Sequence, residues 1–222
     1  MGTFHKILLA DTFCFFDIAQ YQKKEWDNRN TIYTHNGGLM LSVPTKSKNH
    51  FKKTIGDIEI DNQTNWSKKH YKSIFLNYGK HPFFREHKPF LEDMYLSRKW
   101  DKLSSLNVHF YKYILRLLDK DIKIVFASEY NLKGKKSNLV LDMCIKLNAS
   151  TYIFGGEGKN YAQIENFRKN DINLILQEYN HPIYEQYGNK KAFHSHLSIL
   201  DLIMNYDNKS VRDIIMKDNL TI

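Results

Sequence analysis

Cysteine, proline and glycine are all scarce in this chain of 222 residues, which contains 2 Cys, 4 Pro and 10 Gly. Two cysteines are too few for a disulfide framework. Cys14 and Cys144 both lie in apolar runs, where a free, buried thiol that behaves as a small hydrophobic side chain is the usual state. No linker, internal repeat or low-complexity tract interrupts the sequence. We therefore expect one continuous domain over residues 1–222.

Long apolar runs are also missing. No stretch approaches the roughly 18 consecutive apolar residues that a membrane-spanning helix needs. The first residues, MGTFHKILLADTF, lack both the basic region and the small-residue cleavage site of a secretory signal. These absences predict a cytoplasmic protein without a transmembrane segment.

Positive charge is abundant but dispersed. The formal net charge is +9, and the 33 basic residues divide into 27 Lys and 6 Arg, alongside 20 Asn. Nucleic-acid binders gather such charge on one face, whereas these lysines occur as scattered pairs, so we expect no nucleic-acid partner. A positive field would still attract an anionic substrate, such as a nucleotide-activated sugar or an acyl thioester of coenzyme A.

Hydrophobic periodicity predicts an α/β fold. Helical spacing covers residues 4–9, 65–78, 84–95, 100–118, 137–147, 161–168, 197–205 and 210–217. Strand patterns cover residues 12–18, 31–34, 39–43, 57–60, 121–127, 150–154 and 172–179. Asn36-Gly37 predicts a β-hairpin, and the strand, helix, strand order over 121–154 predicts a parallel, right-handed βαβ unit. The expected architecture is a single domain with a mixed, partly parallel sheet flanked by helices.

A dense polar and aromatic cluster lies at residues 17–30. Arginine matches carboxylate or phosphate with a planar fork, amides donate and accept hydrogen bonds, and aromatic rings stack on sugars or bases. This composition predicts ligand binding; the alternative is an ordinary polar loop in which Arg29 pairs with a surface carboxylate. The members are Asp17, Gln20, Tyr21, Trp26, Asn28, Arg29 and Asn30.

Two further segments have features of a site. Trp66 and His70 are four residues apart, so they share one helix face, and His70 could act as a general base or be a satisfied structural histidine. Gly155-Gly156-Glu157-Gly158 follows a strand, but it matches neither nucleotide-binding glycine motif, so a tight turn is the simpler interpretation. The scattered histidines show no zinc-ligand spacing, and no GxSxG indicates a serine hydrolase.

Taken in order, several short motifs resemble those of the WbqC-like family. They are WDNRNTI, LSVPTK, WSKKHYKSIFLNYGKHPFF, SSLN, ASEY, STYIFGGEGKNY, HPIYEQY and LSILDLIMN, and they extend from about residue 4 to residue 206. The resemblance implies a bacterial protein of O-antigen or related surface-polysaccharide biosynthesis. It implies a glycyl or other acyl transferase that acts on a nucleotide-linked amino sugar, with an acyl or aminoacyl donor of open identity.

The resemblance also implies site residues. Lys69 and His70 would be the reactive pair. The substrate-binding residues would be Asp17, Tyr21, Trp26, Asn28, Arg29, Asn30, Tyr161, Tyr184 and Gln186. Asn107, Ser128, Gly156 and Asp201 also match the family's motifs and could equally hold the fold.

The start of the chain departs from the family pattern. Family members usually begin with a strand that ends in a QPxYFPWxGYF-like segment, and residues 2–6 resemble only its tail. We therefore expect the family's first strand to be absent, which would expose a sheet edge. Besides acyl transfer, two other functions remain open: a non-catalytic carbohydrate- or partner-binding accessory protein, and a basic nucleic-acid binder with steeply salt-dependent affinity.

Overall fold

The computed structural model describes residues 1–46, 48, 50–156, 158, 162–188 and 193–221. The helices are α1 (Gly2–Leu8), α2 (Trp66–Tyr78), α3 (Phe84–Glu92), α4 (Leu103–Leu117), α5 (Ser137–Lys146), α6 (Ile164–Arg168), α7 (Ile199–Asn205) and α8 (Asn208–Met216). The strands are β1 (Thr12–Phe15), β2 (Arg29–Thr34), β3 (Gly37–Ser42), β4 (Lys123–Phe126), β5 (Thr151–Phe154) and β6 (Asn173–Leu176).

Among the described residues the strands form three two-stranded ladders. β1 pairs with β4 and β5 pairs with β6, both in parallel, whereas β2 and β3 form the antiparallel hairpin predicted at Asn36-Gly37. The turn is closed by a hydrogen bond from the Thr34 hydroxyl to the Gly37 carbonyl at 2.8 Å, and Gly37 has a φ of 111°. The predicted α/β class with parallel and antiparallel strands flanked by helices is therefore confirmed.

The expected βαβ unit lies one strand further along the chain than predicted. Residues 121–154 contribute β4, α5 and β5, but β4 pairs with β1 and not with β5. The parallel strands joined by a helix are β5 and β6, connected through α6. For residues 121–154 the sequence therefore predicts the order of strand, helix and strand correctly, but the predicted pairing of these two strands is wrong.

Several predicted strands are shorter in the structure or missing from it; the strand predicted at 172–179, for example, spans only Asn173–Leu176. The strand expected at 12–18 ends at Phe15, because the carboxylate of Asp17 turns toward Ser128 and accepts hydrogen bonds from its backbone N–H and its hydroxyl. At 57–60 the chain forms a 3-10 turn, Ile55–Asp57, followed by isolated bridges at Glu59 and Ile60. Thr54 fixes that turn by donating two hydrogen bonds to the Asp57 carboxylate.

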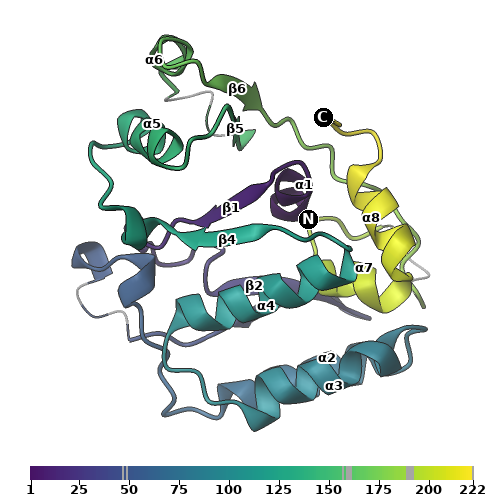
Figure 1. Cartoon of the computed structure of the whole chain (residues 1–222). Coiled ribbons are helices and arrows are strands. Elements are labelled where there is room, and N and C mark those ends of the chain that lie inside the picture. The colour runs from purple at the N-terminus through teal and green to yellow at the C-terminus, as the bar shows by residue number, and fades with distance from the viewer. Residues whose placement is uncertain (47, 49, 157, 159–161, 189–192, 222) are drawn as a thin grey trace.

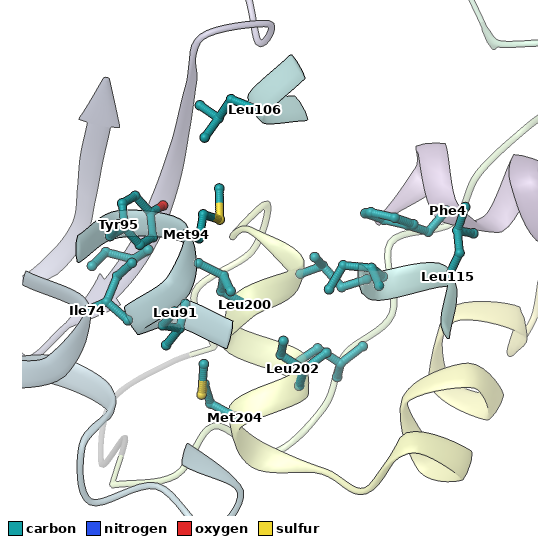
Figure 2. Packing of buried hydrophobic residues seen from close by; sticks show 14 of the residues in the cluster. Phe4, Ile74, Leu91, Met94, Tyr95, Leu106, Leu115, Leu200, Leu202 and Met204 are labelled. Carbon is teal, nitrogen blue, oxygen red and sulfur yellow. The ribbon is translucent and has the colours of Figure 1, made fainter. Parts of the chain in front are cut away.

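The buried side chains form two clusters. The larger one joins α1, α2, α3, α4 and α7, and Figure 2 shows Leu91, Met94, Leu200 and Leu202 packed within it. The smaller one is centred on Phe154 of β5 and includes buried residues of α5 and α6. Figure 1 shows α5, β5, β6 and α6 at one end of the molecule, with β1, β4 and α1 between them and the remaining helices.

Candidate functional site

A cavity of about 1040 Å³ is lined by residues of both hydrophobic clusters. Its wall is made by α1, β1, residues 26–30, and parts of α2, α4, α5 and β5. A pocket of this size accommodates a nucleotide-linked sugar or a comparable small molecule. The sequence elements that enclose it are far apart in the chain, so the cavity is a product of the tertiary fold.

Asn28 and Arg29 lie where β2 begins, on the wall of this cavity. The Asn28 amide Nδ2 donates to the Val43 carbonyl at 2.8 Å, and the Asn28 carbonyl accepts from the Val43 N–H at 2.7 Å. This leaves the Asn28 Oδ1 and the Arg29 Nε buried and without a hydrogen-bond partner among the described residues. Buried polar groups are nearly always paired, so two residues of the cavity lining that each keep an unpartnered polar atom are candidates for ligand contact.

The loop before β2 is hydrogen-bonded to α4, and its Trp26 side chain is exposed to solvent. The Asn107 amide of α4 donates to the Asp27 carbonyl at 2.9 Å and anchors the loop to the core. Trp26 is 60% exposed, and its ring centroid lies 5.6 Å from the Arg29 guanidinium carbon. The Asn30 Oδ1 accepts from the next backbone N–H at 2.9 Å, which leaves the Nδ2 amide group of this cavity-lining residue as a donor.

His70 of α2 lines the same cavity and is only 8% exposed. Its ring packs edge-on against Trp66 at 5.3 Å and Tyr95 at 6.0 Å, and its Nε2 lies 3.2 Å from the Ser42 carbonyl. Ser42 pairs with Arg29 in the ladder of β2 and β3. The residue whose carbonyl contacts His70 is therefore the direct strand neighbour of Arg29.

The surroundings of His70 define its protonation state. Burial lowers its pKa below 6.5, and the hydrogen bond with Ser42 offsets this only in part. The imidazole is therefore neutral near pH 7. Because the Ser42 carbonyl can only accept, Nε2 carries the proton and Nδ1 has the lone pair that a general base needs.

Other predicted residues are directed elsewhere. Lys69 is exposed on α2 and is not part of the cavity wall. Asp17 uses both carboxylate oxygens to bind Ser128, at 3.0 Å and 2.6 Å. Tyr21 is 1% exposed, and its hydroxyl lies 3.3 Å from the Thr45 hydroxyl. The structure therefore brings Trp26, Asn28, Arg29, Asn30 and His70 together, and leaves Lys69, Asp17 and Tyr21 outside.

Tyr184 and Gln186 belong to a separate, fully buried network around Asp201. The Asp201 carboxylate accepts from the Tyr78 hydroxyl at 3.1 Å, the Tyr184 hydroxyl at 2.9 Å and the Gln186 amide at 3.4 Å. Burial raises the pKa of Asp201, and these hydrogen bonds counteract that rise. The network ties α2 and the segment before α7 together. Tyr161 lies outside the described residues.

Sequence reasoning did not single out Lys6, which lines the cavity from α1. A signal was present, because Lys6 stands between Phe4 and the apolar pair Ile7-Leu8 on a short, largely buried helix. Burial lowers the pKa of Lys6. A lysine in such a position has an environment unlike that of the many surface lysines.

The cysteines also line the cavity and are free thiols, as predicted. Burial raises the pKa of Cys14 to about 11 and that of Cys144 to about 12, so neither is a nucleophile near pH 7. Within the described part of the chain, no group of three or more His, Cys, Asp or Glu side chains could hold a metal ion. The described helices include none long and apolar enough to cross a membrane.

Comparison with known proteins places the chain in a defined sequence family. The pattern of the WbqC-like protein family matches residues 1–213. The uncharacterized protein Rv1507c of Mycobacterium tuberculosis is 29% identical over 205 residues, which are 92% of this chain and 87% of that protein. No solved structure matches the chain.

Proposed function

Because this chain belongs to the WbqC-like protein family, we propose that it transfers an acyl or aminoacyl group to the amine of a nucleotide-linked amino sugar during surface-polysaccharide synthesis of the O-antigen type. The observation that carries the proposal is that Asn28 and Arg29 line one cavity with the neutral His70, while the Asn28 Oδ1 and the Arg29 Nε have no hydrogen-bond partner among the described residues. Together they offer an acceptor, a charged donor and a base to one small molecule.

The proposed chemistry uses His70 and Asn30, which line the same cavity. The sugar amine attacks the carbonyl carbon of an activated acyl donor, which forms a C–N bond and a tetrahedral oxyanion. His70 Nδ1 takes the proton that the amine loses. The Asn30 amide donates to the oxyanion. Collapse breaks the bond to the leaving thiolate or alkoxide, which receives the proton from the imidazolium, so the histidine is regenerated.

Binding is assigned to the start of β2. The Arg29 guanidinium pairs with phosphate or carboxylate oxygens, and the Asn28 Oδ1 accepts from a sugar hydroxyl or amine. The exposed Trp26 indole stacks on a sugar ring or base at the rim. Such contacts would hold the acceptor amine close to His70 and reduce the entropic cost of reaction.

The test is a product assay with a matched histidine control. The protein is incubated with a panel of nucleotide-linked amino sugars and acyl donors, and products are identified by mass spectrometry. His70→Gln keeps a donor for the Ser42 carbonyl but removes the base, so it should lower the rate by about 10²- to 10⁴-fold. His81→Gln is the control, because His81 is also 8% exposed with a lowered pKa but does not line the cavity. Absence of any acylated sugar with wild-type protein and every donor would refute acyl transfer.

The exposed Trp26 indole also favours a second candidate, a carbohydrate-binding accessory protein of the same pathway. In a strain that depends on this gene, the two functions predict different results. Acyl transfer requires His70, so His70→Gln should alter the polysaccharide. Binding alone requires Trp26 and Arg29, so Trp26→Ala should abolish function while His70→Gln leaves the polysaccharide unchanged.

A further inference from the structure

Lys6 occupies an unusual electrostatic position in the cavity. Its side chain forms part of the cavity wall. Within the described residues its ammonium group makes no ion pair and no hydrogen bond, whereas Lys46, Lys88 and Lys146 each pair with a carboxylate. An ammonium that is partly removed from water without a counter-charge is costly, so its retention calls for a compensating anion.

The backbone next to Lys6 suits the approach of such an anion. A Cβ added to Gly155 would lie 3.7 Å from the Lys6 Nζ, so the ammonium lies over the first glycine after β5. Gly155 directly follows the carboxyl end of a parallel strand, which is where open parallel sheets bind their ligands. The third glycine of this segment has a different role, because a Cβ at Gly158 would lie 2.5 Å from the Phe154 ring.

The remaining charges on the wall leave this position cationic. Apart from thiols and tyrosines, the other ionisable groups of the lining residues are the side chains of Asp11, Asp27 and Arg29 and the amino group of Met1, whose pKa burial lowers to about 6. Asp11 is exposed to solvent, and burial together with the charge of Glu25 raises the pKa of Asp27. Arg29 and Lys6 lie on different elements, at the start of β2 and on α1, so the cavity offers two separate cationic contacts.

We propose that Lys6 and the adjacent Gly155 backbone form a phosphate-binding subsite, which holds the phosphate groups of one of the two substrates while Arg29, Asn28 and His70 engage the reacting end. The inference rests on the proposed function, because it takes the cavity to be the substrate site. Phosphate is the shared chemistry of two sources, the diphosphate of a nucleotide-linked sugar and the nucleotide end of a coenzyme A thioester. A single lysine recognises phosphate as a point charge, and the glycine permits close approach.

Equilibrium binding tests this subsite without any need for turnover. UDP, coenzyme A and inorganic pyrophosphate are titrated calorimetrically into the full-length protein and into Lys6→Met, Lys6→Arg and Lys69→Met. Lys6→Met should weaken binding of at least one probe by about ten- to a hundredfold, and Lys6→Arg should restore most of it. Lys69→Met is the matched control, because Lys69 is exposed and outside the cavity, so its affinity should equal that of the wild type.

The outcomes separate the sources and the two proposals. A loss confined to UDP assigns the subsite to the acceptor nucleotide, and a loss confined to coenzyme A assigns it to the donor. Lys6→Met should also unfold at the same temperature as the wild type or a higher one, because it removes an uncompensated charge. Wild-type protein that binds no probe, equal affinity of Lys6→Met and wild type, or equal losses in Lys6→Met and Lys69→Met would overturn the subsite. Phosphate binding that depends on Lys6 without any acylated product would leave the subsite standing and refute acyl transfer.

Discussion

Replacing Arg29 by methionine should separate binding from stability. The Arg29 Nε is buried and has no partner within the described residues, and an unpaired buried donor costs about 1–3 kcal/mol. Methionine keeps an apolar stem and removes that donor, but it loses the cation–π contact with the mostly exposed Trp26, which contributes about 0.5–1 kcal/mol. The free energy of unfolding should therefore stay unchanged or rise by up to about 2 kcal/mol, since the two effects oppose one another.

The same substitution should weaken ligand binding. A charge-assisted hydrogen bond contributes about 1.5–3 kcal/mol, so the dissociation constant for a nucleotide-linked amino sugar should rise about ten- to a hundredfold. Stability is measured by urea unfolding followed by circular dichroism, and affinity by calorimetry.

Arg98→Met supplies the matched control for this experiment. Arg98 also lies near a tryptophan, with its guanidinium carbon 5.8 Å from the Trp100 ring centroid, but its Nε donates to the Asp93 carboxylate at 2.6 Å. Its replacement should lower stability by up to about 1 kcal/mol and leave affinity unchanged. Equal affinity of Arg29→Met and wild type, or a stability loss in Arg29→Met as large as that of the control, would refute the assignment of Arg29 to a ligand.

Four further predictions concern protonation and the buried carboxylates. Since burial lowers the pKa of His70 below 6.5, the transfer rate should hold as the pH falls to 6.5 and decline only below it; a decline that begins above 6.5 would contradict a buried base. Burial also lowers the pKa of His87, so below pH 6.5 the unfolded chain takes up a proton that the folded chain resists. The free energy of unfolding should therefore be highest above pH 6.5 and should fall at lower pH. Urea unfolding at about pH 7.5 and 5.5 measures this difference, and His87→Gln should reduce it. Asp201→Ala leaves two buried tyrosine hydroxyls without their acceptor and should cost about 3–5 kcal/mol of stability. Thermal unfolding measures the loss, and an unchanged unfolding midpoint would contradict this role of Asp201. In a double-mutant cycle, Asp17→Ala and Ser128→Ala should show a coupling of about 1.5–3 kcal/mol in the free energy of unfolding. Additive losses would mean that Asp17 does not stabilise the fold through Ser128.

The helices were more predictable than the strand pairs, because helical periodicity is local. The amphipathic pattern at 65–78 predicted α2 to within one residue of its start. The strands are only four to six residues long, and a four-residue apolar run does not encode its neighbour. The pairing of β1 with β4 joins segments more than 100 residues apart through the contact of Asp17 with Ser128, which no local pattern records.

The candidate site was predictable in part for the same reason. Residues 26–30 were identified as part of a dense polar and aromatic cluster and His70 by its helical spacing from Trp66, and the structure places them on the wall of one cavity. The side chains of Tyr184 and Gln186 are also polar, but they donate hydrogen bonds to Asp201. This contact exists only in the folded chain, so the sequence pattern does not show it. Lys6 lies within an apolar stretch of a short helix, but that pattern does not show that the lysine lines a cavity, which only the folded chain forms.

A crystal structure of the protein soaked with a nucleotide-linked amino sugar tests the central claim most directly. One bound molecule should accept a hydrogen bond from the Arg29 Nε, donate one to the Asn28 Oδ1, and contact the His70 imidazole. An empty cavity at saturating ligand, or a molecule bound at a surface that includes none of these three residues, would contradict the account.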